Sequence, residues 1–198
     1  MSDYRHDVYL SWRRAEPVHG WFRRYFFPEF EARLRSTLGH EPRVFVDHRG
    51  VETGDDWEAR LAKELRGACL LVPIWEPQYF RSPWCVAELE YMADRERFLG
   101  YRTADRPEGI ILPLVVQDGR HFADWLDRVQ VQRLEGVLTD AGAFRESSRY
   151  LDFVDGVQRL CDAVEVALER APPWSVDFPA PKLRELPAAP PILLPRFR

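Results

Sequence analysis

The chain has 198 residues and a formal net charge of −4, with 45% hydrophobic and 13% aromatic residues. This length fits one domain, with or without an appendage, and the apolar content is enough for a packed core. The small negative charge gives no reason to expect nucleic acid or an anionic membrane as a partner.

The cysteines and the apolar runs indicate the compartment. Cys69, Cys85 and Cys161 are widely spaced in apolar surroundings, which favours reduced, buried thiols over a disulfide framework or a metal site. The first residues contain no apolar leader, and no window approaches the roughly 18 apolar residues of a membrane span. We therefore expect a cytoplasmic protein.

Short apolar runs alternate with helical patterns along the chain. The predicted strands are Asp7–Trp12, Arg43–Val46, Ala68–Ile74 and Ile110–Val116. The predicted helices are Pro28–Leu38, Trp57–Arg66, one that begins at Pro83, Ala123–Val129 and Ser147–Ala171. This alternation favours an α/β fold, with a doubly wound parallel sheet of about five strands and helices on both faces.

Three segments are less regular. Pro113 argues against a complete ladder in the strand Ile110–Val116, because proline has no N–H to donate. Residues 134–146 show no clear pattern, and residues 14–20 are interpreted as a loop. The aromatic run Trp21–Phe27 fits either a helical turn of its own or an ordered insertion.

The composition changes after Ala171. Eight of the 16 prolines lie between Pro172 and Pro195, a density that excludes a helix or a central strand. We predict a domain over residues 1–171 and a proline-rich tail over residues 172–198 that is extended or packed on the domain.

The stretch from residue 67 to residue 97 carries most of the functional signal. Ser82 and Pro83 form a strong helix start, with a hydroxyl at the N-cap and a proline at the first helical position. Trp84 and Glu88 are four residues apart, so they share a face of this helix. Open parallel sheets bind ligands at this place, outside the carboxyl ends of their strands. The adjacent stripe is expected to be core: Cys85, Leu89 and Met92.

Several of these motifs resemble the sequence boxes of a Toll/interleukin-1 receptor (TIR) domain of bacterial type. They are DVYLSWRR at the first strand, RVFVDHRGVETGDDW at the second, and SPWCVAEL at the helix start, followed by LPLVVQDGRHF. The resemblance covers residues 4–171 and implies a flavodoxin-like TIR fold. One departure is the longer segment between the first strand and its helix.

The resemblance implies one of two functions. Some TIR domains are assembly modules, and others cleave NAD+ at the nicotinamide–ribose bond to give nicotinamide and ADP-ribose or a cyclic form of it. Enzymatic members carry a glutamate in the WCxxE box, which corresponds to Glu88. NAD+ would be a substrate, with no cofactor and no metal. A single carboxylate is chemically sufficient, because nicotinamide leaves as a neutral molecule and needs no general acid, unlike the leaving group of a glycosidase.

The expected substrate-binding residues surround Glu88. Ser11 would bind a ribose hydroxyl, Trp12 or Trp84 would stack on a ring, and basic side chains would pair with the pyrophosphate. Those basic candidates are Arg13, Arg14 and Arg49. Each candidate also has a purely structural interpretation: a solvated carboxylate for Glu88, core packing for the tryptophans, a solvated edge for the arginines and backbone capping for Ser11.

The leading hypothesis is an NAD+-consuming bacterial immune (antiphage) effector or signal producer that is activated by self-assembly. We expect self-association through the loop Asp47–Asp56 and a separate sensor protein as a further partner. The competing hypothesis is a scaffold that binds other TIR domains through the same loop without turnover.

Overall fold

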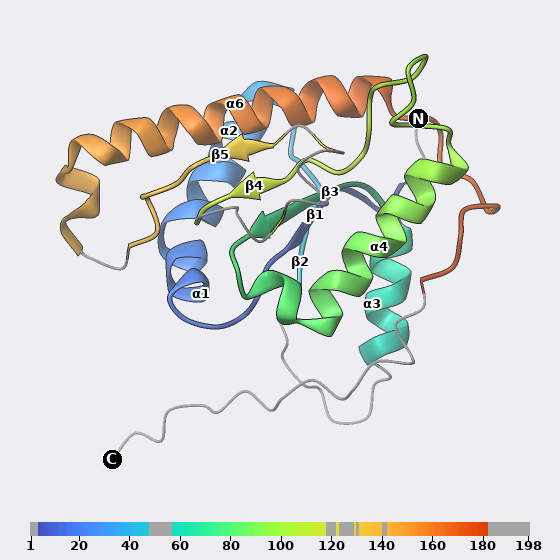
Figure 1. Cartoon of the computed structure of the whole chain (residues 1–198). Helices are drawn as coiled ribbons and strands as arrows, with labels where there is room; N and C mark the ends of the chain where they lie inside the picture. Colours follow the sequence, from blue (N-terminus) through green and yellow to red (C-terminus); the bar gives the residue numbers. More distant parts are fainter. Residues whose placement is uncertain are drawn as a thin grey trace.

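Five parallel strands form one sheet in the order β2-β1-β3-β4-β5. The computed structural model describes residues 4–47, 57–117, 122, 129, 131–139 and 142–181. The strands are β1 (His6–Ser11), β2 (Val44–Val46), β3 (Ala68–Trp75), β4 (Leu114–Val115) and β5 (Gln132–Arg133). This arrangement confirms the predicted doubly wound parallel sheet (Figure 1).

The central strands end together at one edge of the sheet. In β3 every residue is buried, as expected for a strand covered on both faces. The parallel register places Val8 of β1 beside Val44 of β2 and Leu70 of β3, and Ser11 beside Pro73. Side chains that follow β1, β2 and β3 therefore come out at the same edge.

The outer strands differ from the prediction. The strand predicted over Ile110–Val116 is wrong in extent, because only β4 is regular and an isolated bridge joins Ile111 to Leu71. Pro113 interrupts the ladder between these two points. The fifth strand, β5, was not located from sequence, because its two residues are partly exposed and carry no apolar run.

The loop predicted over residues 14–20 is wrong at its end, because helix begins at Val18. Helix α1 (Val18–Trp21) continues into a π-helical turn η1 (Phe22–Phe26) and then into α2 (Phe27–Leu38). The aromatic run is thus part of one helical stretch. Its rings pack on one another, with Trp21, Phe22 and Phe26 almost completely buried.

Three further helices follow the predicted pattern closely: α3 (Trp57–Arg66), α4 (Pro83–Phe98) and α6 (Ser148–Arg170). The 3-10 turns η2 (Tyr79–Arg81) and η3 (Gly142–Glu146) were not predicted. As predicted, Ser82 caps α4, its hydroxyl accepting a hydrogen bond from the Cys85 N–H at 3.4 Å. The helix predicted over Ala123–Val129 falls almost entirely outside the described residues.

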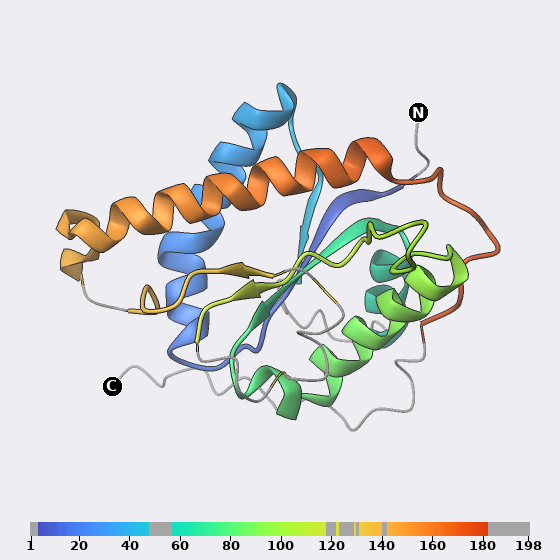
Figure 2. The same cartoon turned by 45° about the horizontal axis from the view of Figure 1, so that its top comes forward.

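Helices cover both faces of the sheet. Helices α2 and α6 lie side by side on one face, and α3 and α4 lie on the other (Figures 1 and 2). The three cysteines are free and buried between these layers. Burial raises the pKa of Cys69 and of Cys161 to about 12, so these thiols are poor nucleophiles.

The first residues of the proline-rich tail pack against the α3 and α4 side of the domain. The indole of Trp174 donates a hydrogen bond to the Arg66 carbonyl, and Phe178 is buried with the Arg95 guanidinium 4.1 Å from its ring centre. Residues 182–198 lie outside the described part of the chain. Within the described residues, none of the helices has the length and apolar character that a membrane crossing requires.

Candidate active site at the carboxyl edge of the sheet

Glu88 lies beneath the carboxyl edge of the central strands. It projects from the second turn of α4 and is 7% exposed. Its Oε1 accepts a hydrogen bond from the Tyr9 hydroxyl at 2.8 Å, and its Oε2 lies 2.5 Å from the Ser11 hydroxyl. Tyr9 and Ser11 are alternate residues of β1, so both side chains leave the strand on the α4 face.

A second tyrosine extends this arrangement. The Tyr79 hydroxyl, from η2, lies 2.8 Å from the Ser11 hydroxyl and 3.1 Å from the Cys85 carbonyl oxygen. Tyr9, Ser11 and Tyr79 are all at most 2% exposed. The result is a buried chain of polar groups that runs from β1 through Glu88 to the start of α4.

Burial dominates the electrostatics of Glu88. It raises the pKa of the carboxyl group above the ordinary value of 4.5, and the hydroxyls of Ser11 and Tyr9 only partly oppose this shift. Asp47 raises the pKa further and Arg14 lowers it. These two residues form an ion pair with each other. Among the described residues, no basic side chain pairs with Glu88 directly.

The aromatic candidates are buried. Trp12 stacks on Phe22 with ring centres 3.8 Å apart, and the Arg14 guanidinium lies 5.2 Å from its ring centre. Trp84, in the first turn of α4, is 4% exposed. Trp84 lies about one helical turn before Glu88, and Trp12 follows Ser11 directly in the chain, but each indole is enclosed by protein in this state.

The two arginines after β1 face different carboxylates. Arg14 pairs with Asp47 at the end of β2, whereas Arg13 lies within electrostatic range of Glu76 at the end of β3. Glu76 is 4% exposed, and burial raises its pKa. Arg49 and the rest of the loop that follows Asp47 lie outside the described residues.

Sequence reasoning missed four residues of this edge. They are Tyr9, Asp47 as an ion-pair partner, Glu76 and Tyr79. Tyr9 could have been found, because it is two residues before Ser11 on a predicted strand and therefore shares its face. Tyr79 gave no signal, since it lies between the predicted strand Ala68–Ile74 and the helix that begins at Pro83, where no periodicity indicates the direction of a side chain.

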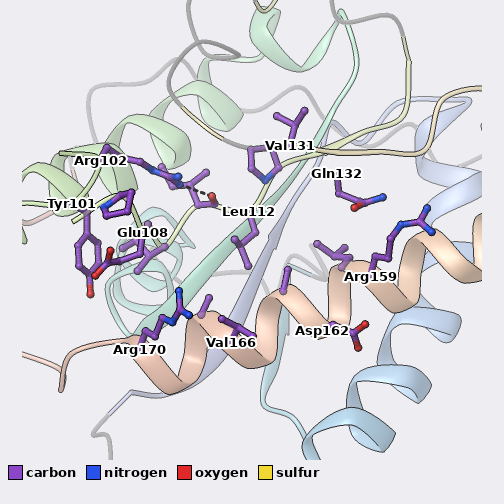
Figure 3. A pocket seen from close by; sticks show the side chains of 18 residues that line it. Tyr101, Arg102, Glu108, Leu112, Val131, Gln132, Arg159, Asp162, Val166 and Arg170 are labelled. Carbon is purple, nitrogen blue, oxygen red and sulfur yellow. Dashed lines mark hydrogen bonds between the residues drawn. The ribbon is translucent and has the colours of Figure 1, made fainter. Parts of the chain in front are cut away.

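Two cavities lined by described residues lie away from Glu88. One of about 500 Å³ lies between α6 and residues 101–113, with Arg159 and Arg170 of α6 on its rim (Figure 3). Another, of about 540 Å³, lies between α3 and residues 174–181. Neither is lined by a candidate site residue.

Comparison with known families decides the assignment of the fold. A family model described as the TIR domain matches residues 19–138, which is more than half of the chain. The chain belongs to the TIR domain family. This match begins in α1, so the β1 box that carries Tyr9 and Ser11 precedes it.

Solved TIR domains are similar to this one over most of the chain. The TIR domains of the activated Roq1 resistosome, which recognises the pathogen effector XopQ, share 15% identity, with a TM-score of 0.40, covering 83% of this chain and 96% of theirs. The TIR domain of the Toll-related receptor TRR-2 from Hydra magnipapillata shares 12% identity, with a TM-score of 0.42, covering 77% and 98%. A search of curated proteins found no match.

Proposed function

We propose that this TIR domain is an NAD+ glycohydrolase that cleaves the nicotinamide–ribose bond, releasing nicotinamide and ADP-ribose or a cyclic form of it. The observation that carries the proposal is the Glu88 carboxyl group. It is buried at the carboxyl edge of the sheet, hydrogen-bonded to hydroxyls and paired with no described basic side chain. Burying such a group costs free energy that a purely structural role would not require.

The chemistry suits a single carboxylate. As the bond to nicotinamide breaks, positive charge develops on the ribose, and a carboxylate in a low-dielectric site stabilises that charge strongly. Glu88 would face the anomeric carbon or the ribose hydroxyls, and Ser11 would orient it. The leaving nicotinamide takes the electron pair of the broken bond and departs neutral, so no general acid is needed.

Substrate binding would use the charged groups around this edge. Arg14 would exchange its bond to Asp47 for the pyrophosphate, and Arg13 and Arg49 are further candidates for that role. Trp84 or Trp12 would stack on a ring only after some rearrangement, because both are enclosed here. The described state therefore corresponds to a resting domain.

Activation would come from self-association through the loop Asp47–Asp56. The ion pair of Arg14 with Asp47 ties the first residue of that loop to the end of β1, so moving the loop would also release Arg14. A sensor protein would promote this assembly, and the biological role would be that of a bacterial antiphage effector or signal producer in the cytoplasm.

One observation favours the second candidate function, a non-catalytic TIR scaffold. Both Glu88 oxygens and the Arg14 guanidinium already have protein partners. A residue kept only to join β1 to α4 would look the same. In that case, substitutions in the Asp47–Asp56 loop would abolish the biological output, and substitutions of Glu88 would not.

The test is nicotinamide release from NAD+ by the purified protein over a wide range of protein concentration. Wild type should turn over NAD+ more rapidly per molecule as concentration rises, and Glu88→Gln should be inactive. Glu90→Gln is the matched control, because Glu90 is an exposed residue of the same helix. Equal turnover by wild type and Glu88→Gln would contradict the proposed mechanism, and no turnover at any concentration would favour the scaffold.

A further inference from the structure

The polar groups around Glu88 make four contacts that each require a hydrogen atom. They are Tyr9 to Glu88 at 2.8 Å, Glu88 to Ser11 at 2.5 Å, Ser11 to Tyr79 at 2.8 Å, and Tyr79 to the Cys85 carbonyl at 3.1 Å. Two oxygens this close repel unless a hydrogen lies between them. The number of available hydrogens therefore reports the protonation of the carboxyl group.

The three hydroxyls supply three hydrogens. Tyr9, Ser11 and Tyr79 each carry one, and the Cys85 carbonyl can only accept. With Glu88 ionised, Tyr9 and Ser11 both donate to the carboxylate, and only the Tyr79 hydrogen is left for two contacts. Either the Ser11–Tyr79 contact or the Tyr79–Cys85 contact then has no hydrogen between its oxygens. With Glu88 protonated, the carboxyl donates to Ser11, Ser11 donates to Tyr79, Tyr79 donates to the Cys85 carbonyl, and Tyr9 donates to the free carboxyl oxygen. Every contact is then filled.

We propose that Glu88 is a neutral carboxylic acid in the resting protein and that Tyr79, acting through Ser11, is the positioning residue that holds it in this form. This protonation state belongs to the same site on which the proposed function rests. It also gives the site a regulatory step, because the carboxyl must lose its proton to solvent before it can stabilise a cationic ribose.

The charged surroundings agree with this assignment. Among the described residues, the charged groups that face Glu88 are Asp47 at the end of β2 and Arg14 after β1. They form an ion pair and act on the Glu88 pKa in opposite directions, with the raising effect of Asp47 the larger. The other titratable neighbours are Tyr9, Tyr79 and Cys85, all buried. Burial raises the pKa of both tyrosines, so they remain neutral donors.

Infrared difference spectroscopy tests the proposal without any assay of turnover. A protonated carboxyl group has a carbonyl stretch that is separate from the carboxylate bands and shifts in D2O. We expect such a band to persist in the wild type after the ordinary acidic side chains have ionised. It should be absent from Glu88→Gln and present in Glu90→Gln. Loss of the band together with the surface carboxylates, near pH 4, would overturn the proposal.

Two conservative variants separate positioning from a merely structural role. Tyr79→Phe removes the hydroxyl to which Ser11 donates, so Ser11 turns to the carboxylate and the titration midpoint of the band should fall by about one pH unit, the effect of one hydrogen bond. Tyr9→Phe removes a donor to the carboxylate, so the midpoint should rise by a similar amount. Shifts in the same direction would contradict the proposed hydrogen-bond order.

Protonation and turnover can fail independently. A Glu88 band in a protein without NAD+ turnover would support this inference and contradict the proposed function. Turnover that depends on Glu88, without a band from a protonated carboxyl group, would support the proposed function and contradict this inference.

Discussion

The two buried carboxylates of α4 are held in different ways, although they lie only about two helical turns apart. Glu88 is 7% exposed and Glu96 is 5% exposed. Glu96 accepts two hydrogen bonds from the Arg102 guanidinium, at 3.0 and 3.1 Å, and two from the backbone N–H groups of Ile110 and Ile111. Among the described residues, the hydrogen-bond partners of the Glu88 carboxyl group are the neutral hydroxyls of Tyr9 and Ser11.

The difference distinguishes a structural carboxylate from a candidate catalytic one. The Glu96 carboxylate carries its counter-charge with it and joins α4 to the segment that leads into β4. Glu88 has no such partner among the described residues, so its negative charge is costly unless a positively charged group arrives. A cationic ribose is such a group. The following predictions test this contrast, from the largest expected effect to the smallest.

Glu88→Gln should abolish activity and leave the fold intact. The amide keeps the shape and accepts from Tyr9, but it cannot supply the negative charge. We expect a loss of at least about 100-fold in kcat, typical of removing a group that stabilises the transition state, and a loss of unfolding free energy of no more than about 1 kcal/mol. Steady-state kinetics and urea unfolding of the same preparation measure both. A large loss of stability would show that Glu88 is a structural residue.

Glu96→Gln should destabilise the protein and leave its activity intact, the opposite of Glu88→Gln. Loss of the charge leaves the Arg102 guanidinium without its partner, and breaking a buried pair costs about 3 kcal/mol. Urea unfolding should show this loss, and turnover per folded molecule should be unchanged. A fall in specific activity comparable to that of Glu88→Gln would remove the contrast between the two residues.

Gly109→Ala should also destabilise the protein, because it disturbs the ion pair between Glu96 and Arg102. A Cβ at Gly109 would collide with the Arg102 guanidinium and with Glu96 Oε1, so the pair must shift. We expect a loss of about 2 kcal/mol, in the range of other overpacked sites. Gly142→Ala is the control, because a Cβ there meets nothing within 4 Å, and it should change the unfolding free energy little.

The pH dependence of stability should also differ between Glu88 and its amide. Burial raises the pKa of Glu88 above 4.5, so the folded protein holds this proton more tightly than the unfolded chain does. The associated stability is complete below about pH 4.5 and is lost as pH rises through the raised pKa. Glu88→Gln should therefore gain stability relative to wild type as the pH rises above about 4.5, by about 1.4 kcal/mol for each pH unit that separates the folded from the unfolded pKa. A constant difference across this range would indicate an ionised Glu88 in the folded protein.

The sequence predicted the central strands and the start of α4 better than it predicted the outer strands. The N-cap at Ser82 and the apolar run of β3 are local signals, and they placed Glu88 near the carboxyl ends of the central strands. β5 has only two residues and gains its hydrogen bonds from β4, so a single-sequence pattern could not locate it. The π-helical turn Phe22–Phe26 depends likewise on tertiary packing of its rings.

Only some of the residues around Glu88 could be predicted from the sequence. Ser11 follows from its place at the end of β1, and Tyr9 follows from the two-residue period of a strand. Tyr79 meets Ser11 only because η2 folds back under β1, a contact across 68 residues of sequence. Glu96 was not distinguished from a surface glutamate, because its partner Arg102 lies beyond the end of the helix.

Nicotinamide release per folded molecule, measured side by side for wild type, Glu88→Gln and Glu96→Gln at high protein concentration, tests the central claim most directly. The account predicts turnover of NAD+ by wild type and by Glu96→Gln, and none by Glu88→Gln. Turnover by Glu88→Gln equal to that of wild type, or no turnover by any of the three, would contradict it.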